Sequence, residues 1–253
     1  MALFPKKVLT YAQMQAIGAG NAGREYFVTD AGVSHWVDDG TLLRPIVQGV
    51  LATEPPSAAT FGTQVNWSTS TLTKTNGLLF INGASASGGV ARLSVTTIPT
   101  PSACQIQAHA VPRNNSALAT VANSSSPDPG LSVVMYEQST GKFALMGFGY
   151  ATSYQNPGAV PFLVTSGGYW ASTSSRTSAN DLMQWGQIPF FRLRISGGTV
   201  FHEQSWDLQT WDQINSVAVT TVFTTQPSHY GVATSHFNGA GSSYGHFDHL
   251  VLG

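Results

Sequence analysis

The chain has 253 residues, of which 42% are hydrophobic and only 9% are charged, and its formal net charge at pH 7 is −1. This length suits one large domain or two modest ones. The 11 Lys and Arg residues form no cluster, whereas a protein that binds the phosphate backbone of nucleic acid needs grouped cations. No stretch reaches the ~20 apolar residues of a membrane span. We therefore expect neither a nucleic-acid partner nor membrane insertion.

The low charge leaves two interpretations open. A monomer with so little net charge is poorly protected against self-association, so the chain is either a soluble protein with a neutral polar surface or a subunit of an assembly. Cys104 is the single cysteine, which excludes an intrachain disulfide. Polar residues interrupt the apolar core that a signal peptide would need within residues 1–18. These features favour a protein that is made or assembled in the cytoplasm.

Residues 1–50 predict a small N-terminal module. Thr10 and Gln13 have capping-box spacing at the start of a short helix over residues 10–17. Two strand-like segments, 25–29 and 34–37, precede a turn at residues 38–40 and a return strand over 41–44, which Pro45 should end.

A hairpin of this size is only marginally stable alone. We therefore expect Trp36, Leu42 and Leu43 to pack between chains or onto the following domain.

The segment from residue 55 to residue 253 predicts a second, all-β domain after a stiff linker at residues 54–56. Short strand patterns with alternating polarity recur between turn signals every 8–14 residues, and no helical period lasts beyond about three turns. Regular short strands of this kind favour a β-sandwich or barrel, and about 200 residues suit a two-sheet jelly roll. The expected strands cover residues 77–81, 91–95, 105–111, 131–136, 143–148, 190–195, 199–204, 217–223, 229–233 and 245–252.

Catalytic carboxylates are scarce. The closest Glu–Asp pair is Glu203 and Asp207, which would lie about 13 Å apart along a regular strand. A glycosidase needs two carboxyl groups that flank the scissile bond, whereas this spacing is typical of a strand that enters an Asp-containing turn. We expect no catalytic site and no enzyme.

Histidines give no clear metal site either. His246 and His249 lie in a predicted strand, where residues three apart point to opposite faces. Phe247, His249 and Val251 would share one face, with His246, Asp248 and Leu250 on the other. We therefore expect neither a metal nor a cofactor.

Aromatic residues supply the candidate ligand contacts. The polar segment 149–186 is long for a buried connection, and it contains Tyr154, Tyr169 and Trp170 among Ser, Thr, Gly and Asn. Rings that stack on sugar faces commonly lie in such loops. Each ring could equally belong to the core, and this alternative remains open.

Two segments resemble known families. Residues 26–45, YFVTDAGVSHWVDDGTLLRP, resemble the "F-V-T-D-x-G … W … D-G-T-x-W-R-P" module near the N-termini of tailed-phage fibre, spike and other virion proteins. Trp36, residues 39–41, Arg44 and Pro45 keep the pattern, while Leu43 replaces its second Trp. The resemblance implies that this module anchors the chain to the virion, with Trp36, Leu42, Leu43 and Arg44 as the assembly residues.

Residues 191–211 resemble the "R-L-R … G-x-T … Y-S-x-D-G-x-x-W" hairpin of concanavalin A-like sandwiches. Residues 230–233 and 245–252 are similar to that family's last two strands, and a weaker similarity extends back to residue 61. Leu208 stands where the turn Gly is usual, and the acidic motif of the family's hydrolases is missing. The resemblance implies a concanavalin A-like jelly-roll sandwich and a lectin-like binding role rather than hydrolysis.

Together these resemblances predict a bacteriophage virion protein, a tail fibre, spike or surface-fibre subunit that is assembled in the host cytoplasm. Its expected partners are sibling chains in a homotrimer, other virion proteins and a host-surface glycan. A head or tail decoration protein without receptor binding is the alternative, followed by a glycan depolymerase.

Overall fold

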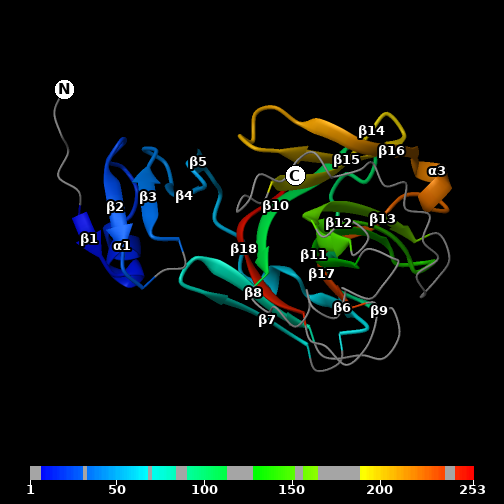
Figure 1. Cartoon of the computed structure of the whole chain (residues 1–253), viewed down its shortest axis with the longest axis horizontal. Helices are drawn as coiled ribbons and strands as arrows, with labels where there is room; N and C mark the ends of the chain where they lie inside the picture. Colours follow the sequence, from blue (N-terminus) through cyan, green and yellow to red (C-terminus); the bar gives the residue numbers. More distant parts are fainter. Residues whose placement is uncertain are drawn as a thin grey trace.

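The computed structural model places the N-terminal elements at one end of the molecule's long axis and a two-sheet sandwich at the other (Figure 1). It describes residues 7–30, 33–67, 70–83, 90–112, 128–151, 156–164, 189–236 and 243–253. No helix within this described part is long and apolar enough to cross a membrane.

A five-stranded sheet forms the N-terminal module, in the order β1-β2-β3-β4-β5. β1 pairs with β2 in parallel, and the other neighbours are antiparallel. The elements are β1 (Lys7–Leu9), α1 (Tyr11–Ile17), β2 (Glu25–Val28), β3 (His35–Asp38), β4 (Leu43–Val47) and β5 (Val50–Leu51). The predicted helix is confirmed together with its capping box, since the Thr10 hydroxyl accepts from the Gln13 amide and the Gln13 side chain accepts from the Thr10 amide.

The module has a small core of its own. Met14, Tyr26, Val28 and Trp36 are fully buried in it. α1 covers one face of the sheet through Met14, which explains why a hairpin of marginal stability is ordered at this place. The module contains two strands that the sequence patterns do not indicate. β1 and β5 have only three and two residues, which is too short for an alternating pattern to show.

Pro45 does not end its strand, contrary to the expectation from sequence. β4 runs from Leu43 to Val47, and Pro45 pairs with Trp36 of β3. The Pro45 carbonyl accepts from the Ala52 amide at 2.9 Å, on the side where β5 ends. The hydrogen-bonding groups of a strand residue point to the same side, so the missing N–H of Pro45 leaves the β3–β4 ladder intact.

Two antiparallel sheets contain most of the described residues after the junction. The seven-stranded sheet has, in order, β16 (Asp212–Ala218), β15 (Thr199–Ser205), β14 (Phe190–Ser196), β10 (Cys104–Pro112), β18 (Ser243–Leu252), β8 (Leu78–Gly83) and β7 (Thr71–Thr75). The six-stranded sheet has β13 (Asn156–Val164), β12 (Lys142–Ala151), β11 (Asp128–Glu137), β17 (His229–His236), β9 (Val90–Thr97) and β6 (Thr63–Val65). A 3-10 turn, η1 (Ala58–Thr60), precedes β6.

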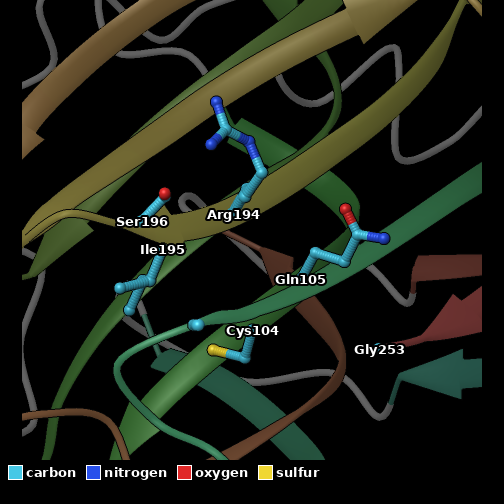
Figure 2. Close-up of a pocket in the computed structure, with 7 residues that line it drawn as sticks. Cys104, Gln105, Arg194, Ile195, Ser196 and Gly253 are labelled. Atoms are coloured by element: carbon cyan, nitrogen blue, oxygen red, sulfur yellow. The ribbon is translucent and has the colours of Figure 1, made fainter.

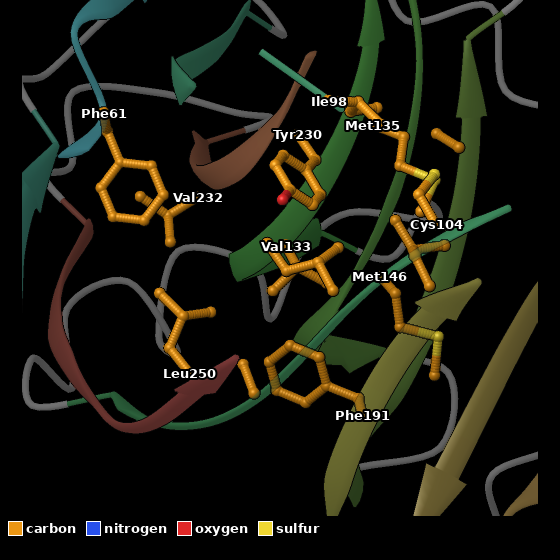
Figure 3. Packing of buried hydrophobic residues seen from close by; sticks show 14 of the residues in the cluster. Phe61, Ile98, Cys104, Val133, Met135, Met146, Phe191, Tyr230, Val232 and Leu250 are labelled. Atoms are coloured by element: carbon orange, nitrogen blue, oxygen red, sulfur yellow. The ribbon is translucent and has the colours of Figure 1, made fainter. Parts of the chain in front are cut away.

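The main core lies between these two sheets. Phe191 and Leu250 from the seven-stranded sheet pack towards Val133, Met146 and Val232 from the six-stranded sheet (Figure 3). A second buried apolar cluster covers the opposite side of the six-stranded sheet and includes Leu93, Val134, Tyr136, Leu145 and Ala233. The six-stranded sheet is thus apolar on both faces, whereas the seven-stranded sheet is apolar on its inner face and rich in polar residues on the other.

The predicted strand over residues 217–223 is wrong in its second half. β16 ends at Ala218, and a one-turn helix, α3 (Val219–Val222), follows. Val219 and Val222 are both buried, and residues three apart share a face only in a helix. These apolar side chains therefore reach the core from one face of a helical turn, whereas the sequence pattern predicted the alternating faces of a strand.

A β-bulge in β18 changes the predicted faces of the last strand. His109 of β10 pairs with His249, but the next residue, Ala110, pairs with Phe247, so that Asp248 is an extra residue. Phe247 and Leu250 consequently both enter the core. His246 and His249 lie on the same outer face, which corrects the expectation of opposite faces.

Residues 54–56 connect the two parts of the chain while bonded to both. The Glu54 carboxylate pairs with Lys74 of β7 at 2.6 Å and accepts from the Tyr11 hydroxyl of α1 at 2.7 Å. Lys74 also donates to the Pro55 carbonyl at 2.6 Å. The segment is therefore a bonded junction between the module and the sandwich.

Candidate functional site

The seven-stranded sheet turns a polar outer face away from the core at β10, β14 and β15. Side chains alternate along a strand, and Ile106 and Leu193 point into the core. Their neighbours therefore point outward. The register places Arg192 of β14 between Gln107 of β10 and Glu203 of β15.

A second outward row runs parallel to the first. Arg194 lies between Gln105 and Phe201 in the same three strands. The two rows bring both arginines of β14 to one side of the sheet, two residues apart, with amide and aromatic side chains beside them.

Glu203 is held between these two arginines. Its Oε2 accepts from Arg192 Nε at 2.7 Å and Arg194 Nε at 3.2 Å, and its Oε1 accepts from Arg194 Nη2 at 2.8 Å. Burial alone would raise the pKa of Glu203, but the hydrogen bonds from the two guanidinium groups outweigh burial and lower this pKa. Glu203 is thus an ionised acceptor, and a carboxyl group of this kind is poorly suited to donate a proton.

Asp207, the other carboxylate of the pair considered above, belongs to a turn. Its Oδ1 accepts from the backbone amides of Gln209 at 2.8 Å and Thr210 at 2.7 Å. These bonds lower the pKa of Asp207. The structure therefore gives this carboxylate the turn-stabilising role that its sequence context indicates.

Aromatic rings support both guanidinium groups. Arg192 Cζ lies 4.0 Å from the ring centroid of Trp211, and Arg194 Cζ lies 4.2 Å from that of Phe201. Cation–π contacts of this length orient an arginine and add to its attraction for the ring. Arg192 is mostly covered, whereas 30% of the Arg194 side chain is exposed.

An open cavity of about 280 Å³ adjoins Arg194. It is lined by Ala103, Cys104, Gln105, Arg194, Ile195, Ser196 and Gly253. Figure 2 shows that Arg194, Gln105 and Ser196 project to one side of the strands, while Ile195 and Cys104 project to the other. The polar lining of the cavity is therefore on the outer face.

The N-terminal module covers another part of the same outer face through a group of residues that we call the interface cluster: Gln48, Thr53, His109, Asp248 and His249. His109 Nδ1 bonds with Asp248 Oδ1 at 2.6 Å, and its Nε2 bonds with Gln48 Nε2 at 2.9 Å. The Thr53 amide donates to His249 Nδ1 at 2.8 Å. Two histidines of the sandwich thus form hydrogen bonds with Gln48 and Thr53 from the N-terminal part of the chain.

His249 is nearly completely buried in this cluster. Burial lowers its pKa to about 4, helped by the neighbouring His109 and Arg44 and opposed by Asp248. Since its Nδ1 accepts from Thr53, the neutral ring carries its proton on Nε2. Apolar contacts among Val47, Ala52 and Phe190 surround the cluster.

Comparisons with known proteins concern the fold alone. No family model and no curated protein matches the chain. A functionally unknown protein from Saccharomyces cerevisiae is 13% identical, with a TM-score of 0.50 over 78% of this chain and 98% of that chain. The lumenal domain of VIP36, solved with Ca²⁺ and Man3GlcNAc, is 8% identical, with a TM-score of 0.45 over 73% of this chain and 81% of that chain.

A β-glucanase from Bacillus licheniformis is 9% identical, with a TM-score of 0.40 over 72% of this chain and 80% of that chain. The two packed sheets of β-strands agree with the sequence-based expectation of a sandwich fold. The fold is a concanavalin A-like β-sandwich. A shared fold does not by itself decide between binding and catalysis.

The residues predicted to contact a ligand on the concanavalin A-like sandwich, Tyr154, Tyr169 and Trp170, lie outside the described residues. Within the described part of the chain, no group of three or more His, Cys, Asp and Glu side chains is placed to hold a metal ion. His246 instead lies beside the Phe80 ring, at 5.5 Å between centroids.

The predicted assembly residues lie in three different environments. Trp36 is fully buried in the module core and donates through Nε1 to the Val33 carbonyl at 2.7 Å. Leu43 packs on the same core, whereas Leu42 is half-exposed. Arg44 bridges Asp39, at 2.5 Å, and the Thr53 hydroxyl, at 3.0 Å. Trp36 also contacts the sandwich at the β7–β8 turn, and packing between chains stays a prediction.

The outward arginines were missed by sequence reasoning, although a signal for them exists. Arg192 and Arg194 are spaced by two in a predicted strand, and Glu203 lies at a similar distance from the hairpin turn in the next strand. Pairing these strands about Gly197 and Gly198 would have placed the three charges on one face.

Proposed function

We propose that this chain is a subunit of a bacteriophage virion, a tail fibre, spike or surface-fibre protein whose concanavalin A-like sandwich attaches to a host-surface glycan. Two features support the proposal. Residues 26–45 resemble a virion module, and they lie within a compact five-stranded sheet with its own core. The sandwich offers guanidinium, amide and aromatic groups on one open face, a combination suited to sugar hydroxyls and sugar rings.

The observation that carries the proposal is the firm attachment of the module to the sandwich. Tyr11 and Trp36 contact the β7–β8 turn at Gly77, while Gln48 and Thr53 bond to the histidines of β10 and β18. A binding head that is held at a set angle to its anchor suits a particle with many copies, since rigid presentation lowers the cost of binding several sites at once.

Adsorption to host cells tests this function. The purified chain, added in excess, should block adsorption of the phage, and the labelled chain should bind host cells but not cells stripped of surface polysaccharide. Light scattering should report a trimer, as expected for a fibre subunit. Unchanged adsorption together with no binding to cells would contradict the receptor-binding role.

A decoration protein remains the second candidate. The cavity beside Arg194 is small and open, which would suit a surface whose role is packing within the particle. A particle that retains adsorption but loses mechanical or thermal stability without this chain would support that role.

A glycan depolymerase is the third candidate. Glu203 is poorly suited to transfer a proton in such an enzyme, because it is held in ion pairs with Arg192 and Arg194. This activity would release reducing ends from host polysaccharide.

A further inference from the structure

We propose that the open part of the outer face binds the carboxylate of an acidic sugar, such as a uronic acid, with Arg194 as the anchoring group. This inference rests on the proposed glycan-binding function and names the class of glycan. The site comprises Arg194, Gln105 and Ser196, which line the cavity and project to the same side of the sheet (Figure 2).

The first argument is the charge of the site. Arg192 and Arg194 provide two positive charges on this face, and Glu203 provides one negative charge. The side chains of these three residues therefore sum to one positive charge. Glu203 is buried and committed to both arginines, so it cannot reach out to compensate that charge. A single carboxylate from a ligand would neutralise the group.

The second argument is the geometry of the Arg194 fork. Glu203 occupies the edge formed by Nε and Nη2, at 3.2 and 2.8 Å. A guanidinium has five N–H donors, and the edge formed by Nη1 and the second Nη2 proton can receive another planar carboxylate with two parallel hydrogen bonds. The Phe201 ring, 4.2 Å away, supports the guanidinium in this orientation. The group is thus oriented before a ligand arrives.

The third argument identifies a sugar rather than a simple anion. Gln105 and Ser196 place an amide and a hydroxyl beside Arg194, and such groups donate to and accept from ring hydroxyls. A Cβ placed at Gly253 would lie 3.4 to 3.9 Å from atoms of the Gln105 side chain, so this side chain runs along Gly253 at the edge of the cavity. A volume of about 280 Å³ is near the lower end of small-molecule clefts, which suits one sugar unit of a chain.

Direct binding to the chain of residues 1–253 tests the site. We would titrate the protein with trigalacturonate and with the neutral galactose trimer, following saturation-transfer NMR at constant ionic strength. Trigalacturonate should bind in the millimolar range and at least tenfold more tightly than the neutral trimer. Equal affinity for the two trimers would overturn the proposal.

Two variants locate the binding, and a third serves as control. Arg194→Gln removes the fork, and Ser196→Asp adds a repelling carboxylate at an exposed position where it does not disturb packing. Each should weaken trigalacturonate binding at least fivefold. Lys142→Gln makes the same charge change as Arg194→Gln on β12 of the other sheet and should leave binding unchanged. If Arg194→Gln lowers the stability of the fold, Ser196→Asp alone still decides.

Inorganic sulfate separates a sugar site from an anion site. Sulfate at the same concentration should displace little of the trigalacturonate, and complete displacement would overturn the assignment to a sugar. The two proposals also fail differently. If the Ser196→Asp chain blocks adsorption as well as the parent chain does, the acidic-sugar site is wrong and glycan attachment stands. If the parent chain binds no host cell at all, attachment itself is wrong.

Discussion

Gly77 offers a direct test of how the N-terminal module docks on the sandwich. It lies in the β7–β8 turn with φ of +81°, and a Cβ built there would lie 2.9 Å from a ring carbon of Trp36 and 3.2 Å from one of Tyr11. Gly77→Ala should therefore cost about 1 kcal/mol for a left-handed non-glycine backbone. The clash with two packed rings adds roughly 1–3 kcal/mol, the usual cost of overpacking.

Gly49→Ala is the matched control. Gly49 has a nearly identical φ of +82°, but nothing lies within 4 Å of the Cβ position. Its substitution should cost only the backbone term of about 1 kcal/mol. Urea unfolding, followed by tryptophan fluorescence, gives both free energies of unfolding. If the two variants lose the same stability to within about 0.5 kcal/mol, the rings of the module do not pack against this turn and the docking argument is wrong.

Three further substitutions probe single groups. His249→Asn should flatten the pH dependence of stability. The folded-state pKa of His249, about 4, lies below the ordinary 6.5, so the free energy of unfolding of the wild-type chain should fall by about 3 kcal/mol as pH falls from 6.5 to 4. If urea unfolding shows the same change with pH for the variant and the wild type across this window, the assignment is wrong. Glu137→Gln should cost about 2 kcal/mol in thermal melts, because the carboxylate accepts from the Thr224 amide at 2.9 Å and the Thr225 amide at 2.8 Å. Burial raises the pKa of Glu137, but the hydrogen bond from the Thr140 hydroxyl, together with those from Thr224 and Thr225, outweighs burial and lowers this pKa to about 2. The stabilisation should therefore be complete above pH 4.5 and decline below it. Leu208→Gly should change stability by less than about 1 kcal/mol, since relief of its positive φ of 61° offsets the loss of its packing at the module boundary, and a loss of several kcal/mol would show that packing dominates.

The sandwich strands could be predicted because their side chains alternate between a core and a second environment. The central strands, such as β10 and β14, carry an apolar residue at every second position, and the sequence pattern places them within one or two residues. Short edge strands such as β5 and β6 have too few residues to show any period. The pairing of β6 also depends on β9, a strand that is distant in sequence.

Single-residue deviations explain the other differences. The extra residue Asp248 shifts the alternation of β18, and no pattern in one strand can reveal how its partner pairs. Leu208 shows the opposite case. Resemblance to a family that usually has Gly at this position points to a left-handed backbone, and the structure has one there, with the Leu side chain packed beside Val47 and Phe190.

The candidate site was harder to predict than the fold because it depends on register. Arg194 and Ser196 lie in β14 and Gln105 lies 89 positions before Arg194 in β10, and only the pairing of these two strands brings them together. Composition draws attention instead to the aromatic segment 149–186. An approach that looked for charges in outward positions of adjacent predicted strands would have found the arginines and Glu203 without any knowledge of the loops.

The interface between module and sandwich combines two kinds of contact that have different consequences. Val47, Ala52 and Phe190 remove apolar surface from water, a contact that tolerates sliding. The bonds from Gln48 to His109 and from Thr53 to His249 are directional, and a shift of one residue would break both of them. The apolar contacts therefore supply affinity, while the histidine bonds select one docking angle. Within the described part of the chain, that angle leaves the Arg194 side chain partly exposed beside its cavity, so the same interface that joins the two parts also sets which portion of the outer face the module covers.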